Sequence, residues 1–327
     1  MRGLRIAAML VGLLCVNAQA VGRALQGFVD VNGVRLEYLD WGGRGPVLIL
    51  IHGLADGPHV FDDLAPGFTD RYHVVAYATR QSGVSDAVGP YDVDTMTEDL
   101  SEVMDALRVS KATLVGYSAS GNEVTAMAVA HPERVERLVY LDAGYDWSDP
   151  DFEVLVKALP KRGSAVPASA LTSLAAFWAY QKAVVYPGLG DLSRIEANLL
   201  ERIAIQRDGS VKLRFSEERG HAIYSALWSN KPREYGQVRC PVLAVYATSV
   251  FDLHSANGDW RRELQAYEDA YWKPFQLKSI ERVRREIAGV QVAQVPGAHV
   301  SFTLTERPRI VRLIRKFLAG QDRARQH

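Results

Sequence analysis

Short aliphatic runs that alternate with helical patterns restrict the fold of this 327-residue chain more than any other feature. The run Val47–Ile51 has no polar position and follows Gly45-Pro46, which is typical of a strand buried on both faces. Thr95–Leu107 and Asn122–Ala130 carry apolar residues at helical spacing. Further aliphatic runs occupy His73–Tyr77, Ala112–Tyr117, Leu138–Leu141, Val242–Tyr246 and Val290–Val295. Such alternation predicts a mostly parallel α/β sheet with helices on both faces.

Two further strands are predicted near the amino end, at Phe28–Val31 and Val34–Trp41. The Asn32-Gly33 pair between them is the strongest short signal for a hairpin turn. With the six runs above, these strands make an eight-stranded sheet.

The succession of strands and helices breaks between residues 146 and 238. This stretch lacks strong strand runs and carries three helical patterns, at Ser169–Val184, Leu192–Ile205 and Ser216–Trp228. Ser193 and Glu196 have the spacing of a capping box. We therefore expect a core of residues 21–145 and 239–327, with residues 146–238 inserted as a helical cap. One or two amphipathic helices are also expected at 255–288, before the last strand.

The first twenty residues have the features of a signal peptide. Arg2 and Arg5 precede the apolar run Ile6–Val16, and Ala18-Gln19-Ala20 fits the small residues before a cleavage site. The run is too short to span a bilayer, so no stable membrane anchor is expected. We predict cleavage after Ala20 and a secreted or periplasmic protein.

Composition excludes several classes of protein. The 38 Lys and Arg balance 38 Asp and Glu, so there is no basic excess to neutralise nucleic-acid phosphates. Beyond the predicted signal peptide Cys240 is the only cysteine, which rules out an intramolecular disulfide and a cysteine-rich metal site. No cluster of His, Asp and Glu has ligand spacing, so we expect no metal and no cofactor.

The segment Leu114–Gly121 carries the sharpest chemical signal. An apolar strand runs into Ser118, which small residues flank and a helix follows, close to the G-x-S-x-G nucleophile elbow. Such a turn is strained and raises the serine hydroxyl above the sheet. Gly116 meets the need for a small residue two positions earlier. Ser120 replaces the second glycine and adds a side chain at a crowded point.

Together with four other segments, this elbow resembles the α/β-hydrolase fold. The segments are Ile51-His52-Gly53-Leu54, Arg80–Asp86 with Gln81 in place of a glycine, Pro132–Asp142, and Pro296-Gly297-Ala298-His299. They occur in the order of that family. The resemblance implies a serine nucleophile, Ser118, and a histidine base, His299. It also implies an oxyanion hole built from the backbone N–H groups of Leu54 and Ala119.

An acid must orient the histidine and stabilise its charged form. In this fold the acid lies between serine and histidine in chain order. Asp252 is the first carboxylate after the predicted strand Val242–Tyr246, and we expect it to be the acid. Asp142, at the end of the preceding strand, is the rival.

A serine nucleophile favours acyl transfer to water over the epoxide and carbon–halogen chemistry of family branches with an aspartate nucleophile. We expect Tyr117, Trp178 and Trp228 to line a substrate pocket under the cap, which suggests an ester with an apolar or aromatic part. The predicted function is a secreted serine hydrolase of small carboxylic esters, lactones or thioesters. A lyase or cofactor-free perhydrolase on the same triad, and a ligand-binding protein on the same fold, are the alternatives.

Overall fold

The computed structural model describes residues 24–80, 82–160, 166–228, 231–256 and 258–324. The predicted signal peptide, residues 1–20, lies outside this range. Among the described helices, none is both apolar enough and long enough to cross a membrane.

Eight strands form the central sheet, in the spatial order β1-β2-β4-β3-β5-β6-β9-β10. β1 pairs with β2 and β2 pairs with β4 in antiparallel fashion, and every other pair is parallel. The predicted mostly parallel, eight-stranded α/β sheet is therefore confirmed. The strands are β1 (Leu25–Val31), β2 (Val34–Gly42), β3 (Val47–Ile51), β4 (His73–Tyr77), β5 (Ala112–Tyr117), β6 (Val135–Leu141), β9 (Val242–Ser249) and β10 (Gln291–Ala298).

The predicted hairpin turn is present between the first two strands. Asn32 and Gly33 have φ angles of 48° and 74°, and Val31 pairs with Val34 across them. Positive φ at both central positions gives a turn whose twist matches that of the flanking strands.

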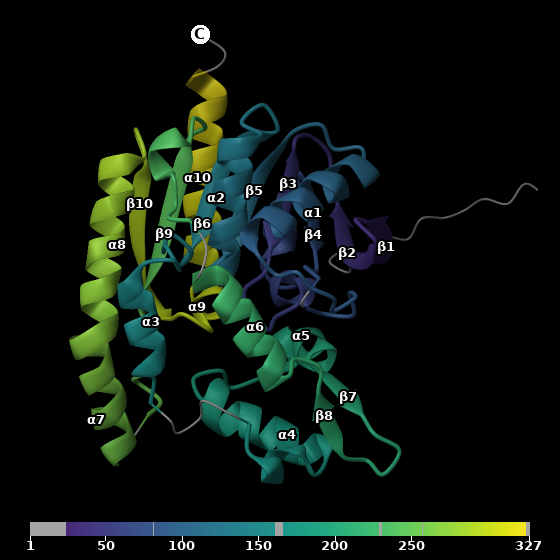
Figure 1. Ribbon diagram of the computed structural model, residues 1–327, viewed down its shortest axis with the longest axis vertical. Helices are drawn as coiled ribbons and strands as arrows, with labels where there is room; N and C mark the ends of the chain where they lie inside the picture. The colour runs from purple at the N-terminus through teal and green to yellow at the C-terminus, as the bar shows by residue number, and fades with distance from the viewer. Residues whose placement is uncertain (1–23, 81, 161–165, 229–230, 257, 325–327) are drawn as a thin grey trace, which may run out of the picture.

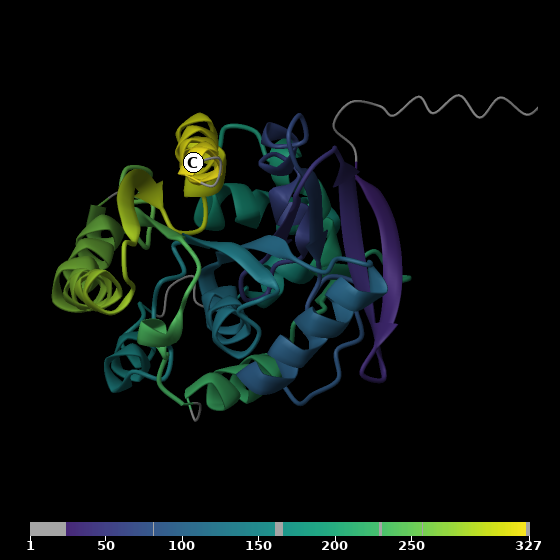
Figure 2. The ribbon, with the colours of Figure 1, turned by 90° about the horizontal axis from the view of Figure 1, so that it is seen from above.

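Helices cover both faces of the sheet (Figure 2). The side chains of β3 show why both faces need this cover. Ile49 and Ile51 pack in one buried cluster with α1 (Val93–Ala106), α2 (Gly121–Ala130) and α8 (Lys273–Glu286). Leu48 and Leu50 point to the opposite face, where they pack in a second cluster with α10 (Arg307–Ala324). Since successive side chains of a strand alternate in direction, an all-apolar strand requires cover on both sides.

A layer of short elements lies beyond the ends of the central strands (Figure 1). It has a buried cluster of its own, which includes Phe177, Leu199 and Ile203. Its elements are α3 (Pro150–Lys157), α4 (Leu174–Tyr180), a π-helical turn (Gln181–Val185), α5 (Glu196–Glu201), β7 (Ile203–Ile205), β8 (Val211–Leu213) and α6 (Glu217–Trp228). All of them fall within the predicted cap segment.

Two details of this layer differ from the sequence analysis. The pattern at Leu192–Ile205 ends in β7, which pairs with β8 across a turn in which Gly209 has a φ of 83°. The capping box does not form: the residue before α5 is Ile195, which makes no side-chain cap, and the backbone N–H of Ser193 donates to Asp191 at 2.9 Å.

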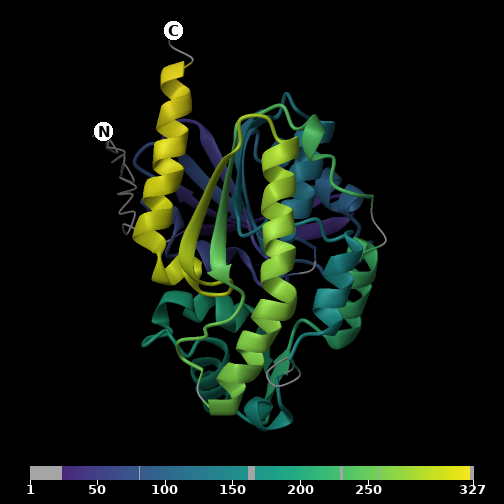
Figure 3. The ribbon, with the colours of Figure 1, turned by 90° about the vertical axis from the view of Figure 1, so that its left-hand side faces the viewer.

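Residues 255–288 contain α7 (Gly258–Tyr267), a π-helical turn (Glu268–Trp272) and α8. Figure 3 shows α7 and α8 as one long column beside β9 and β10. The expected helices before the last strand are present.

Candidate active site

Ser118 lies on a sharp bend between β5 and α2. Its φ is +56°, a left-handed conformation that is strained for a residue with a side chain. The bend is crowded on both sides. A Cβ atom on Gly116 would lie 2.7 Å from Val124 Cγ2, and one on Gly121 would meet the carbonyl oxygen of Ala143. Glycine at these two positions therefore allows the close approach that raises Ser118 above the sheet.

Ser120 fits the crowded position because its hydroxyl has hydrogen-bond partners there. The buried Oγ atom is 2.8 Å from the carbonyl oxygen of Ile51 and 2.9 Å from that of Tyr117. These bonds tie the turn after β5 to the end of β3. The departure from glycine thus adds a link between the two loops that frame Ser118.

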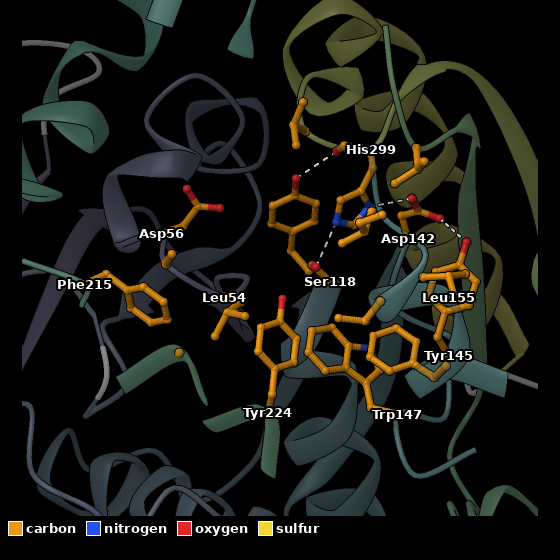
Figure 4. A pocket seen from close by; sticks show the side chains of 18 of the residues that line it. Leu54, Asp56, Ser118, Asp142, Tyr145, Trp147, Leu155, Phe215, Tyr224 and His299 are labelled. Atoms are coloured by element: carbon orange, nitrogen blue, oxygen red, sulfur yellow. Dashed lines mark hydrogen bonds and ion pairs between the residues drawn. The ribbon is translucent and has the colours of Figure 1, made fainter. Parts of the chain in front are cut away.

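His299 follows β10 and faces Ser118 (Figure 4). Its Nε2 atom is 2.8 Å from Ser118 Oγ, within reach for removing the hydroxyl proton. The chain reaches this position through Gly297, whose φ is +113°. The ring stacks on Tyr117 with 5.4 Å between centroids, and the Tyr117 hydroxyl donates to the backbone oxygen of His299 at 2.8 Å.

Asp142 provides the carboxylate behind the ring, so our preference for Asp252 is wrong. Asp142 Oδ2 is 2.6 Å from His299 Nδ1, and the Asp142 side chain is completely buried. Asp252 instead accepts hydrogen bonds from the backbone of His254 and Ser255 and from the Ser255 hydroxyl, within its own loop.

The loop after β9, which contains Asp252, is held in place by Glu268. The Glu268 carboxylate accepts hydrogen bonds from the backbone N–H groups of Val250 and Phe251 and from the Ser249 hydroxyl. Val250 lines the cavity at the strand end where an acid was expected. The acid comes instead from the end of β6, where Asp142 has a φ of +47°.

Two residues missed by the sequence analysis support the acid. The Tyr145 hydroxyl donates to Asp142 Oδ1 at 2.6 Å, and Gln276 Nε2 donates to the Tyr145 oxygen at 2.8 Å. Burial, with the nearby Asp142 carboxylate, raises the pKa of Tyr145 well above its usual value, so the phenol remains a donor. Tyr145 lies three residues after Asp142, but nothing in the sequence marks it or Gln276 as part of a site.

The loop after β3 passes beside the serine. A Cβ atom on Gly53 would lie 2.9 Å from Ser118 Cβ, so glycine is required there. His52 fixes the loop: Nε2 accepts from Thr79 N–H at 3.1 Å, and Nδ1 then donates to the Gly53 oxygen at 2.7 Å. Burial lowers the pKa of His52, which favours this neutral form. Leu54 lines the cavity above Ser118, and Ala119 directly follows the serine.

A cavity of about 640 Å³ opens above Ser118, and most of its lining side chains are apolar. Tyr117 lines it, as predicted. Trp178 does not; it packs against Phe177 in the buried cluster of the cap. Trp228 ends α6, and its side chain lies outside the part of the chain that the structure describes. Other aromatic side chains line the cavity instead: a stack of Phe152, Trp147 and Tyr224, and Trp272 beside His299.

An ion pair forms part of the polar wall of this cavity, which Gln181 and His221 also line. Arg202, at the end of α5, lies 3.9 Å from Asp56, which is in the loop after β3. Asn198 also donates to Asp56, at 3.0 Å. A charged pair in a mostly apolar wall can orient the polar end of a substrate.

Within the described residues, His, Asp and Glu side chains come close enough to share a metal ion at Glu37, His59 and Glu201. None of these three residues lines the cavity above Ser118. The cavity holds a serine, a histidine and a buried carboxylate in the order needed to activate the hydroxyl.

Comparison with known proteins agrees with this geometry. A family model described as alpha/beta hydrolase fold matches residues 46–249. The putative carbamate hydrolase RutD of Caulobacter segnis is 38% identical over 125 residues, which are 37% of this chain and 46% of that protein. Epoxide hydrolase 4 of Mus musculus is 29% identical over 132 residues, which are 39% of this chain and 37% of that protein. The match thus spans less than half the length of either relative.

Solved structures resemble nearly the whole chain. E-2-(acetamidomethylene)succinate hydrolase superposes with a TM-score of 0.67 at 20% identity, covering 91% of this chain and all of that one. The enol-lactonase from Burkholderia xenovorans LB400 gives a TM-score of 0.59 at 21% identity, covering 90% of this chain and all of that one. These likenesses show a shared fold, and the family match extends over more than half of the sequence. The chain belongs to the alpha/beta hydrolase family.

Proposed function

We propose that this protein is a serine hydrolase that cleaves small carboxylic esters, including lactones and thioesters, through an acyl-enzyme. The observation that carries the proposal is the hydrogen-bonded series Ser118, His299 and Asp142, with distances of 2.8 and 2.6 Å. A serine hydroxyl is a weak nucleophile at neutral pH, and a base in contact with it removes that limitation.

In the first half of the reaction, His299 Nε2 takes the proton as Ser118 Oγ attacks the carbonyl carbon. Asp142 accepts the Nδ1 hydrogen bond and stabilises the imidazolium that forms. The backbone N–H groups of Leu54 and Ala119 are proposed to bind the negative oxygen, a contribution of roughly 3 kcal/mol for each donor. His299 then gives its proton to the leaving alcohol, and the acyl group stays on Ser118.

In the second half, water attacks the acyl group with His299 again as the base, and Ser118 is released. The cavity favours substrates with an apolar or aromatic part, because aromatic and aliphatic side chains form most of its wall. The same acyl transfer would apply to the carbamate in the name of one relative and the enol lactone in the name of one structural neighbour.

The test is hydrolysis of p-nitrophenyl esters from acetate to octanoate by the wild type and by Ser118→Ala. Turnover of at least one chain length is expected in the wild type, with a loss of about 10³-fold or more in the variant. Absence of hydrolysis at every length would exclude the ester proposal. Labelling of Ser118 by a fluorophosphonate without ester turnover would favour the non-hydrolytic alternative. Failure to label would favour the ligand-binding one.

A further inference from the structure

Two glutamates and a histidine meet where the cap contacts the core, away from Ser118. Glu37 lies in β2 and is completely buried, His59 lies in the 3-10 helix Pro58–Phe61, and Glu201 ends α5. One carboxylate oxygen from each glutamate and one imidazole nitrogen all lie within 4.8 Å of one another. The 3-10 helix and α5 contact each other directly, so this group joins the two parts of the molecule.

The imidazole is oriented toward the glutamates by a fourth residue. His59 Nδ1 is 2.7 Å from Asp62 Oδ2, and Nε2 is 3.5 Å from Glu201 Oε1. When Nδ1 donates to Asp62, the Nε2 lone pair points to the glutamates. A carboxylate that holds the second nitrogen of a histidine is the usual outer partner of a metal-binding imidazole.

Glu201 is the observation that points to a ligand. Its side chain is only 10% exposed, and neither carboxylate oxygen accepts a hydrogen bond of ordinary geometry from a described residue. Glycine at position 57 leaves the space beside Oε2 open, since a Cβ atom there would collide with it. A buried carboxylate without hydrogen bonds destabilises the folded state unless another charge or a proton compensates it.

Two arginines near Glu201 do not compensate its charge. Arg214 and Arg219 line a small cavity beside it, but they donate hydrogen bonds to backbone carbonyl oxygens.

We propose that Glu37, His59 and Glu201 bind a divalent transition-metal ion, with Zn²⁺ as the representative, and that this ion fastens the cap to the core. An imidazole nitrogen in the ligand set favours such an ion over Ca²⁺ or Mg²⁺, which take oxygen ligands. The three ligands come from widely separated segments, so no spacing in the sequence could show the site. The site is independent of the proposed ester chemistry.

The test is Zn²⁺ binding by the full chain after dialysis against EDTA, measured by equilibrium dialysis at pH 7.5 and by thermal unfolding. We expect one Zn²⁺ per chain and a higher unfolding temperature, because an ion that binds only the folded state stabilises it. Ca²⁺ and Mg²⁺ at the same concentration should have no comparable effect. In Glu201→Gln, the affinity should fall at least about tenfold and the rise in unfolding temperature should disappear.

Glu196→Gln is the matched control. Glu196 is exposed on the same helix, so its loss changes the net charge equally without touching the site, and Zn²⁺ binding should be unchanged. His59→Gln provides a second variant that leaves both buried glutamates in place and should also lose binding. Circular dichroism checks that each variant is folded. The absence of stoichiometric Zn²⁺ binding by the wild type, or binding retained in Glu201→Gln, would overturn the proposal.

Discussion

The imidazole of His299 is held from three directions. Asp142 receives a hydrogen bond from one nitrogen, Ser118 lies against the other, and the ring of Tyr117 stacks on its face. The backbone N–H of His299 also donates to the Ser249 oxygen at 2.9 Å. A base fixed in this way presents one tautomer to the serine, which is what proton transfer from the hydroxyl requires.

The assignment of the acid gives the first prediction. Asp142→Asn should lower kcat for a p-nitrophenyl ester by about 10³- to 10⁴-fold, because the amide favours the wrong tautomer of His299. Asp252→Asn is the control and should stay within about twofold of the wild type, since that carboxylate bonds only within its own loop. A large loss of kcat in Asp252→Asn, with little loss in Asp142→Asn, would show that Asp252 is the catalytic acid.

The second prediction concerns Tyr145, a positioning residue. Tyr145→Phe removes the donor to Asp142 Oδ1 and should lower kcat by about five- to fiftyfold with little change in KM. Tyr246→Phe, whose hydroxyl donates to the Gly144 oxygen, is the matched control and should keep kcat within about twofold of the wild type.

The third prediction concerns the pH dependence of stability. Burial raises the pKa of Glu123 to about 8 from 4.5, although the Tyr77 hydroxyl donates to it at 2.6 Å. Between these pH values the unfolded chain releases this proton and the folded protein keeps it, so the free energy of unfolding falls as pH rises.

Glu123→Gln keeps the shape of the side chain and removes this titration. Urea unfolding at pH 5.5 and 7.5 should show a decrease in the wild type that exceeds the decrease in the variant by about 2 kcal/mol. Equal decreases in the two proteins would show that Glu123 is ionised throughout this range.

Ser118 and His299 could be predicted because each lies in a short segment whose local pattern forces its geometry, a strand followed by a tight bend. Asp142 and Asp252 both follow predicted strands, so local pattern could not separate them. Their roles depend on which strand end lies next to the imidazole ring of His299 in the folded sheet. The same holds for Trp178, since packing within the cap decides which side of α4 meets the cavity.

Among the helices and strands, the junction of β5 and α2 is under close steric control. Gly121→Ala would place a Cβ atom against the backbone oxygen of Ala143, next to Asp142. The backbone must move, so we expect a loss of about 2–3 kcal/mol in the free energy of unfolding and a lower kcat. Gly190→Ala is the control, because nothing lies within 4 Å of the added atom, and it should change stability by less than about 0.5 kcal/mol. A Gly121→Ala protein as stable as the control would contradict the close packing.

The long helices and strands could be predicted from the sequence. An all-apolar run such as Val47–Ile51 can be buried only in a sheet whose two faces are both covered. The short helices and strands of the cap could be predicted less well. β7 and β8 have three residues each, which is too short for an alternating pattern to predict them. Their pairing is stabilised by the buried cluster around Ile203, which forms only when the cap folds.

The cap and the core share polar contacts as well as the cavity. Asn198 is completely buried, accepts a hydrogen bond from Gly57 N–H at 3.1 Å and donates to Asp56. Arg194 pairs with Asp63 at 2.5 Å and donates to the Leu304 oxygen. These contacts hold the apolar wall of the cap over Ser118, so the catalytic group and its cavity form one site between two layers.

Activity-based labelling tests the central claim, that His299 and Asp142 make Ser118 nucleophilic. The wild type and Ser118→Ala are incubated with a fluorophosphonate at pH 7.5, and the modified peptide is identified by mass spectrometry. We expect one adduct per wild-type chain, on Ser118, and none in the variant. An unlabelled wild type, or an adduct on another residue that persists in Ser118→Ala, would contradict it.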